Sequence, residues 1–432
     1  MPRQHVRFLA SRTAPALLWT LGWVGLGCGS TDSDTGSDND NEELPEMIPV
    51  AGCEGFDLSN CNVVETDCQQ EVMGLVSCLR GNDSADLPPV RTISPDEYRG
   101  ELEAEAASED PPDTRFELAL TWLDLVEPDG LSTEQQIDTT VDNVVAYYSP
   151  ERQDITLVLG DGSVAAQDQE RATSTLAHET VHALQDGDVD LDAQQELFAS
   201  SYDSWLGFRS VVEGEAEVYQ TIIDAALWGL RLQDVSLSAR FDQLCRWTAE
   251  SVIAAPNPFL ETLYSFPYSF GGRYVNAELE TNGNAVVRAL PTAPPGGTLP
   301  IILLNQEPVD AEPWPDVPLE PDGYEPVVWD SLGAWLLYIY LSRDALTPAD
   351  AAVVANNWVA DRFWVYGEVY ILSLLWRLRV TDAATAEQLA AAIPPHTTSV
   401  PWSVRVSGNE VLLGMTNGGF DLEAWLDSVL AE

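Results

Sequence analysis

The alternation of apolar and polar residues predicts amphipathic helices along much of the chain. Apolar positions recur at intervals of three and four residues, which places them on one face of an α-helix. One long pattern of this kind begins near Glu170 and ends around Asp186, and a second runs from about Gln194 to Leu230. The other segments with this pattern are Ser94–Ala107, Thr114–Val126, Asp330–Leu341 and Phe420–Glu432.

Shorter segments rich in β-branched and aromatic residues predict strands. These segments are Val144–Asp161, with two strands around a Ser-Pro turn, Val369–Val380, and Trp402–Met415, a hairpin turning at Ser407–Asn409. Asn257–Glu280 predicts a mixture of loop and helix, and Pro291–Pro326 predicts a linker or an extended loop region. The predicted fold class is therefore α+β and helix-rich.

The first 27 residues are typical of an export signal. Three arginines precede the apolar stretch Ala14–Leu26, which is too short to span a membrane permanently. The small residues that follow, together with Cys28, resemble a bacterial lipoprotein signal, in which the cysteine carries the lipid. Gly25 stands where that pattern prefers Leu, so ordinary secretion is the alternative. Both interpretations predict export, either to the bacterial cell envelope (outer membrane or cell surface) or into the medium.

Composition divides the rest of the chain into segments. Residues 28–50 are acidic and lack aromatic residues, which predicts a flexible tether. Residues 51–90 form a cysteine-rich segment without the C-x-x-C pairs of a zinc ribbon, so we expect two disulfides of open connectivity. The cysteines concerned are Cys53, Cys61, Cys68 and Cys78. Cys245 is predicted to be a buried thiol. We expect a core at 91–290 and an α+β region at 291–432 that completes or flanks it.

The charge of the chain restricts its partners. It carries 70 acidic and 20 basic residues, a formal net charge of −50 at pH 7. Such a chain repels nucleic acid and anionic lipid headgroups, so neither is an expected partner. No apolar run after residue 27 is long enough to cross a bilayer. Contact with a membrane is therefore expected only through a lipid anchor, and the oligomeric state stays open.

Two of the four histidines lie four residues apart in the first long helical pattern. His178, Glu179 and His182 form H-E-x-x-H, and positions i and i+4 share one face of a helix, so both imidazoles can bind one ion. A zinc ion in a hydrolytic site takes three protein ligands and keeps a position for water, and Glu179 would accept a proton from that water. The alternative is a helix with two ordinary histidines.

The second long helical pattern supplies a candidate third ligand. Glu213 and Glu217 are again i and i+4, and apolar residues surround them, which favours a metal-binding or paired role over a solvated charge run. We predict that Glu213 binds the metal and that Glu217 accepts the free ring N–H of a histidine ligand. Glu215 falls on another face and is expected in solvent. Gly214, unfavourable in a helix, predicts close approach to the histidine helix. A helix with a charged outer face is the alternative.

These motifs resemble those of the gluzincin metallopeptidases, the thermolysin-like clan. "HETVH" and "EGEAE" match its H-E-x-x-H and downstream E-x-x-x-D, with Glu217 where the clan more often has Asp. The chain is more closely similar to uncharacterised bacterial proteins of metallopeptidase type, which carry H-E-x-x-H-A-L-Q-D, then E-G-D-A, then P-Y-x-x-G. The resemblance covers about Asn143–Leu290 and, more faintly, Asn356–Tyr366. It implies a zincin-like core but supplies no substrate.

The resemblance also implies an edge strand before the histidine helix that pairs with extended substrate. Asp154–Leu159 is the matching segment, and such pairing favours a peptide or an unfolded protein as substrate. A tetrahedral intermediate needs an oxyanion donor. Tyr268, beside Gly271 and Gly272, is the first candidate, with aromatic packing as its alternative role. His396 is the second candidate, although a surface loop position is expected for it.

Three hypotheses follow from the sequence. The leading one is an exported, zinc-dependent peptidase with one Zn²⁺ and Glu179 as general base. The second is a non-catalytic binding or scaffold lipoprotein that keeps a zinc-stapled helix pair. The third is a structural lipoprotein without metal. Glu179 favours the first, because a purely structural metal site needs no general base.

Overall fold

A computed structural model describes residues 50, 52–58, 61–82, 87–108, 114–128, 133–160, 164, 168–231, 235–304, 326–368, 370–393 and 400–431. The predicted export signal, the lipidation candidate Cys28, the predicted acidic tether up to residue 49, and His396 lie outside these residues.

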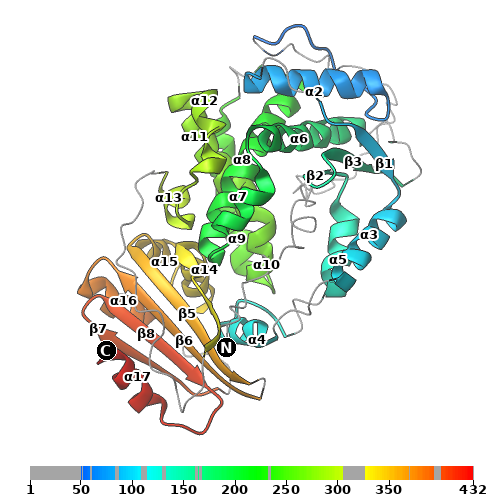
Figure 1. The fold of residues 1–432 in the computed structure, drawn as a ribbon. Helices are drawn as coiled ribbons and strands as arrows, with labels where there is room; N and C mark the ends of the chain where they lie inside the picture. Colours follow the sequence, from blue (N-terminus) through cyan, green and yellow to red (C-terminus); the bar gives the residue numbers. More distant parts are fainter. Residues whose placement is uncertain are drawn as a thin grey trace, which may run out of the picture.

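The described residues form a helix-rich α+β fold, as the sequence predicts. The buried helices α6 (Gln169–Asp188) and α8 (Tyr202–Leu227) pack against each other near the centre (Figure 1). Helix α2 (Thr66–Arg80) packs on α6, and α11 (Gly272–Asn282) packs on α8. The remaining helical segments before the second sheet are α3 (Pro95–Ser108), α4 (Thr114–Trp122), α5 (Thr133–Asn143), α7 (Leu191–Phe198), α9 (Leu237–Ala254), α10 (Pro258–Phe266), the π-helix η3 (Pro267–Gly271), α12 (Asn284–Val287), η4 (Leu290–Thr292) and α13 (Thr298–Leu303).

The segment predicted as one helix from Gln194 to Leu230 is two helices, α7 and α8. Ser201 between them has extended backbone, and its hydroxyl accepts a hydrogen bond from the N–H of Ser204 at 3.2 Å. A serine in this position satisfies an N–H that the first turn of a helix leaves unpaired. This cap therefore marks the start of α8 as a helix separate from α7.

A small sheet lies beside α6. Its strand order is β1 (Val90–Ile93), β3 (Asp154–Val158) and β2 (Ala146–Ser149), with β1 parallel and β2 antiparallel to β3. The prediction that Asp154–Leu159 forms an edge strand is wrong, because Val90–Ile93 pairs along its second side. Within the described part of the chain, the strand next to α6 that has one unpaired edge is β2.

The C-terminal part contains a five-stranded antiparallel sheet with helices on both faces. Its strand order is β4 (Pro326–Asp330), β5 (Trp358–Glu368), β6 (Ile371–Val380), β8 (Glu410–Thr416) and β7 (Trp402–Ser407). Alternate residues face opposite sides. Trp364 and Leu412 pack on α17 (Leu422–Leu430), whereas Phe363 and Leu413 join the main core. The other helices of this part are α14 (Gly333–Asp344), α15 (Pro348–Ala355) and α16 (Ala383–Ala392) (Figure 1).

Two segments are more helical than the sequence predicts. Asn257–Glu280 is helical from Pro258 onward, through α10, η3 and α11, without an intervening loop. Thr298–Leu303, within the predicted linker, forms α13 and packs on α8. Helix α14 also packs on α8 and α9, so the C-terminal part contacts the central helices directly.

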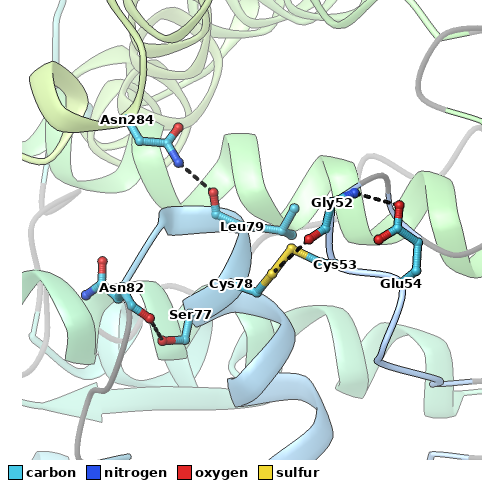
Figure 2. Close-up of a disulfide and its surroundings, with 8 residues drawn as sticks. All are labelled: Gly52, Cys53, Glu54, Ser77, Cys78, Leu79, Asn82 and Asn284. Atoms are coloured by element: carbon cyan, nitrogen blue, oxygen red, sulfur yellow. Dashed lines mark hydrogen bonds between the residues drawn. A yellow bond between two sulfur atoms is a disulfide. The ribbon is translucent and has the colours of Figure 1, made fainter.

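Two disulfides close the cysteine-rich segment, as predicted, and the connectivity is Cys53–Cys78 and Cys61–Cys68. Cys53–Cys78 ties the chain before α2 to the last turn of that helix (Figure 2). Cys245 is a buried free thiol, as predicted. Among the described residues, no helix has the length and apolarity needed to cross a bilayer.

Candidate metal centre

Three side chains from two helices converge in the interior. Nε2 of His178 and Nε2 of His182, both on α6, lie 3.3 Å and 3.4 Å from Oε2 of Glu213 on α8. All three side chains are at most 4% exposed. Their ligand atoms lie within 4.8 Å of one another, so this group could hold a metal ion. The sequence prediction that these three residues meet is confirmed in the structure.

Two glutamine side chains orient the imidazole rings. Nδ1 of His178 lies 2.9 Å from Oε1 of Gln220, whose amide nitrogen donates to Ser174. Nδ1 of His182 lies 2.9 Å from Oε1 of Gln185. Because each amide presents its oxygen to the ring, each Nδ1 must carry the donated proton. The Nε2 lone pairs of the neutral rings therefore point toward Glu213, as metal ligation requires.

The three converging ligand atoms favour a cation between them. Two neutral imidazole nitrogens and a carboxylate oxygen are all acceptors, and acceptors held this close repel one another. Two ligands on a tetrahedral zinc ion, each at about 2.0–2.2 Å, lie roughly 3.4 Å apart. The two N···O separations, 3.3 Å and 3.4 Å, equal that spacing. The chemistry of the three groups and these two separations therefore fit a bound metal ion, and all three ligand atoms lie within 4.8 Å of one another.

When no metal ion is bound, a proton on His182 can supply the positive charge between these acceptors. Burial disfavours a charged His182, but hydrogen bonding to Glu213 and the charge of that carboxylate outweigh it and raise the pKa of His182 to about 9. Burial lowers the pKa of His178. Contact with both histidines outweighs burial and holds the pKa of Glu213 well below its usual value. A metal ion must therefore displace a proton from His182.

Arg209 fixes the second oxygen of the carboxylate ligand. Its Nη2 donates to Oε1 of Glu213 at 2.9 Å, one helical turn along α8, and its side chain is 1% exposed. Nη1 donates to the carbonyl of Leu263 at 3.3 Å. Because Arg209 occupies Oε1, Glu213 presents only Oε2 to the histidines and would bind an ion through one oxygen.

Glu179 is held by the small sheet. The backbone N–H of Tyr148 on β2 donates to Oε2 of Glu179 at 2.8 Å, and the Glu179 carboxyl is buried beside His182 and Glu213. Burial is the main cause that raises the pKa of Glu179 to about 8. This value, close to neutral pH, suits a group that takes up and returns protons.

The π-helix η3 brings Tyr268 to the site. The Tyr268 ring stacks on the ring of His178 with centroids 5.9 Å apart, and the residue is 5% exposed. Burial and the negative charge of Glu213 raise the pKa of Tyr268 well above its usual value, so its hydroxyl keeps its proton at neutral pH. Single π-turns are common at functional sites. Tyr268 thus lies at the site as a proton-carrying donor.

Two glycines let η3 approach α8. A Cβ on Gly214 would overlap the backbone of Gly271, and a Cβ on Gly271 would overlap the carbonyl of Ser210. The sequence correctly predicts a close approach at Gly214, but its partner is η3 and not the histidine helix. Behind η3, the ring of Trp335 on α14 packs on Phe270 with centroids 4.8 Å apart, so the C-terminal part supports this turn.

The structure corrects two predictions for α8. Glu217 accepts from neither histidine ligand, because Gln220 and Gln185 occupy the two Nδ1 positions. Burial raises the pKa of Glu217 to about 8, and its Oε2 has no hydrogen-bond partner among the residues that the structure describes. Glu215 is not solvated: its side chain is 1% exposed and forms an ion pair with Arg80 on α2. The helix is buried on all sides, so the face on which a residue lies does not decide its exposure.

Sequence reasoning missed Gln185, Gln220, Arg209 and Arg80. Gln185 follows His182 by three residues and Gln220 follows Glu213 by seven, so helical spacing places each glutamine on the same face of its helix as a candidate ligand. Arg209, four residues before Glu213, could have been found in the same way. Arg80 carries no local signal, because it meets α8 through a contact 135 residues apart in the chain.

Comparisons with protein-family models, with curated proteins and with solved structures each return no match to this chain.

Proposed function

We propose that this chain is an exported, zinc-dependent metallopeptidase of the gluzincin type. The observation that carries the proposal is the position of Glu179, a buried carboxyl next to the convergent set of His178, His182 and Glu213. Two imidazoles and one carboxylate are the ligand set of hydrolytic zinc sites, which leave one coordination position for water or substrate.

Zinc in such a site lowers the pKa of its water to near 7 and polarises a carbonyl group. The side chains would do the rest. With Oε2 held by the N–H of Tyr148, Glu179 keeps Oε1 to take a proton from water and pass it to the leaving amine. The hydroxyl of Tyr268, which keeps its proton, would donate a hydrogen bond to the oxygen on which negative charge develops.

The proposed substrate is a peptide or an unfolded protein. A peptide in extended form can add to a strand with a free edge, and β2 is the strand next to the site whose second edge is paired with no other strand of the described residues. The net charge of −50 disfavours nucleic acid as a partner. Attachment to the cell envelope through Cys28, with secretion as the alternative, is part of the same proposal and rests on the sequence of the first 28 residues.

The burial of the site favours a second candidate function. His178, Glu179, His182 and Glu213 are each at most 3% exposed, which is also expected of a closed structural metal site. In this case the ion would staple α6 to α8 in a non-catalytic binding or scaffold lipoprotein.

A comparison of native protein with one variant distinguishes the two proposed functions. Native protein and the Glu179→Gln variant are purified, their bound zinc is measured, and both are incubated with a mixed peptide library. The peptidase proposal expects about one zinc ion in both and cleavage by the native protein alone. Zinc in both with no cleavage that depends on Glu179 would favour the staple, and absence of zinc affinity would reject both.

A further inference from the structure

A buried chain of polar contacts connects α2 to the metal centre. Helix α2 belongs to the disulfide-closed segment and lies outside the histidine motif and the glutamate motif. Its last residue, Arg80, has a side chain that is 0% exposed. Burying a guanidinium costs folding free energy unless the group is paired and hydrogen-bonded. The partners of Arg80 therefore indicate its role.

The main partner of Arg80 is Glu215 on α8. Nε donates to Oε1 of Glu215 at 2.7 Å, and Nη2 donates to Oε2 at 3.2 Å. Nη1 donates to Asp188, which also pairs with Arg288. The paired geometry fixes the plane of the Glu215 carboxylate. Cys53–Cys78 and the bond from Asn284 to the Leu79 carbonyl hold the end of α2 in place (Figure 2).

Glu215 in turn orients Gln185, which contacts the proposed metal ligand His182. Its Oε2 accepts from Nε2 of Gln185 at 2.8 Å, and Gln185 also donates to the carbonyl of Val212 at 3.0 Å. With both amide hydrogens directed at acceptors, the amide oxygen must face Nδ1 of His182, 2.9 Å away. The chain Arg80–Glu215–Gln185–His182 therefore sets the tautomer in which His182 offers Nε2 to the ion.

We propose that Arg80 and Glu215 are positioning residues for the metal centre, so that α2 and its disulfide are part of the site. The inference rests on the proposed metal-binding function and deepens it. Neither residue touches the ion; both act through the orientation of Gln185. Loss of a group hydrogen-bonded directly to a metal-bound histidine, which for His182 is Gln185, typically weakens metal affinity by 10- to 100-fold.

The test measures zinc affinity by competition with a chelator, and separately measures the unfolding of the metal-free protein. Glu215→Met removes one of the two acceptors of Gln185 and leaves the Val212 carbonyl, so zinc affinity is expected to fall about 10-fold, the lower end of the range for a direct partner of a metal ligand. Glu215→Gln keeps one oxygen for Gln185 and is expected to stay within a few-fold of native. Arg288→Gln is the matched control, because it removes an ion pair to Asp188 without touching Glu215.

The double variant Arg80→Met with Glu215→Met separates positioning from simple stabilisation. Removing both partners leaves no unpaired charge between them, so the metal-free stability is expected to recover relative to the Glu215→Met variant. Zinc affinity is expected to stay low, since Gln185 still lacks one of its two acceptors and keeps only the carbonyl of Val212. Recovery of affinity together with stability, or native affinity in Glu215→Met, would overturn the inference. Native protein that does not bind zinc would instead overturn the proposed function.

Discussion

The backbone N–H of Tyr148 donates to the carboxylate of Glu179 at 2.8 Å, which ties the unpaired edge of β2 to the histidine helix. The hydroxyl of the same tyrosine donates to Asp186, also on α6, at 2.8 Å. One residue of the sheet therefore makes two separable contacts with α6, one from its backbone to the candidate general base and one from its side chain.

This separation predicts the effect of Tyr148→Phe. The change removes the bond to Asp186 and leaves the backbone bond to Glu179 intact. A hydrogen bond to a charged group contributes about 1.5–3 kcal/mol, and we expect the lower part of that range because this bond is partly buried. Urea denaturation should show the loss of stability, while peptide hydrolysis stays within about two-fold of native. A large loss of activity at native stability would contradict this division.

Tyr268→Phe is expected to affect turnover more than metal binding. Loss of one oxyanion donor typically lowers kcat by about 100- to 1000-fold. The ring packed against His178 is retained, so zinc affinity should change only a few-fold. Steady-state kinetics and chelator competition check the two halves. An unchanged kcat would reject Tyr268 as an oxyanion donor and leave it only a packing role.

Zinc uptake is expected to release protons. The pKa of His182 in the metal-free protein is raised to about 9, so at pH 6 its ring is charged and must lose a proton before Nε2 can bind an ion. Titration calorimetry in buffers of different ionisation enthalpy should give at least one proton released per ion. Zinc affinity should correspondingly rise with pH up to about 9. Binding without proton release would argue against His182 as a ligand.

A buried carboxyl that is not one of the candidate metal ligands predicts a pH effect on stability. Burial raises the pKa of Asp330 to about 7, against an ordinary value of 3.8. Between these values the unfolded chain loses the proton that the folded chain keeps, so stability falls as pH rises from about 4 to 7. The shift corresponds to a loss on the order of 4 kcal/mol.

Asp330→Asn does not titrate, so it removes this contribution. Relative to native protein, the variant should gain stability as pH rises from 4.5 to 7.5, measured by denaturant unfolding of both without metal. A constant difference between the two proteins across that range would show that Asp330 ionises equally in the folded and unfolded states.

The sequence predicts the candidate metal ligands better than the residues that orient them. His178, His182 and Glu213 are identifiable because helical spacing and an apolar context restrict where such groups can lie. The orienting residues depend on the packing of separate elements. Glu215 is buried in an ion pair with Arg80 of α2, a long-range contact that no local pattern encodes.

The same distinction applies to the fold. The C-terminal hairpin at Ser407–Asn409 and helix α17 follow from local turn residues and apolar spacing, and both are confirmed. The position of Asp154–Val158 in the middle of its sheet follows from pairing with Val90–Ile93, more than sixty residues earlier. The segment around Tyr268 is helical, although the sequence predicts a mixture of loop and helix there. Its two glycines serve close packing, Gly271 against Ser210 of α8 and Gly272 against Phe241 of α9.

The most direct test of the account is a crystal structure of protein purified with zinc, with anomalous differences collected on both sides of the zinc absorption edge. The account predicts one zinc peak bonded to Nε2 of His178, Nε2 of His182 and Oε2 of Glu213. A zinc peak on other residues, or none at this position in protein that contains the metal, would contradict it.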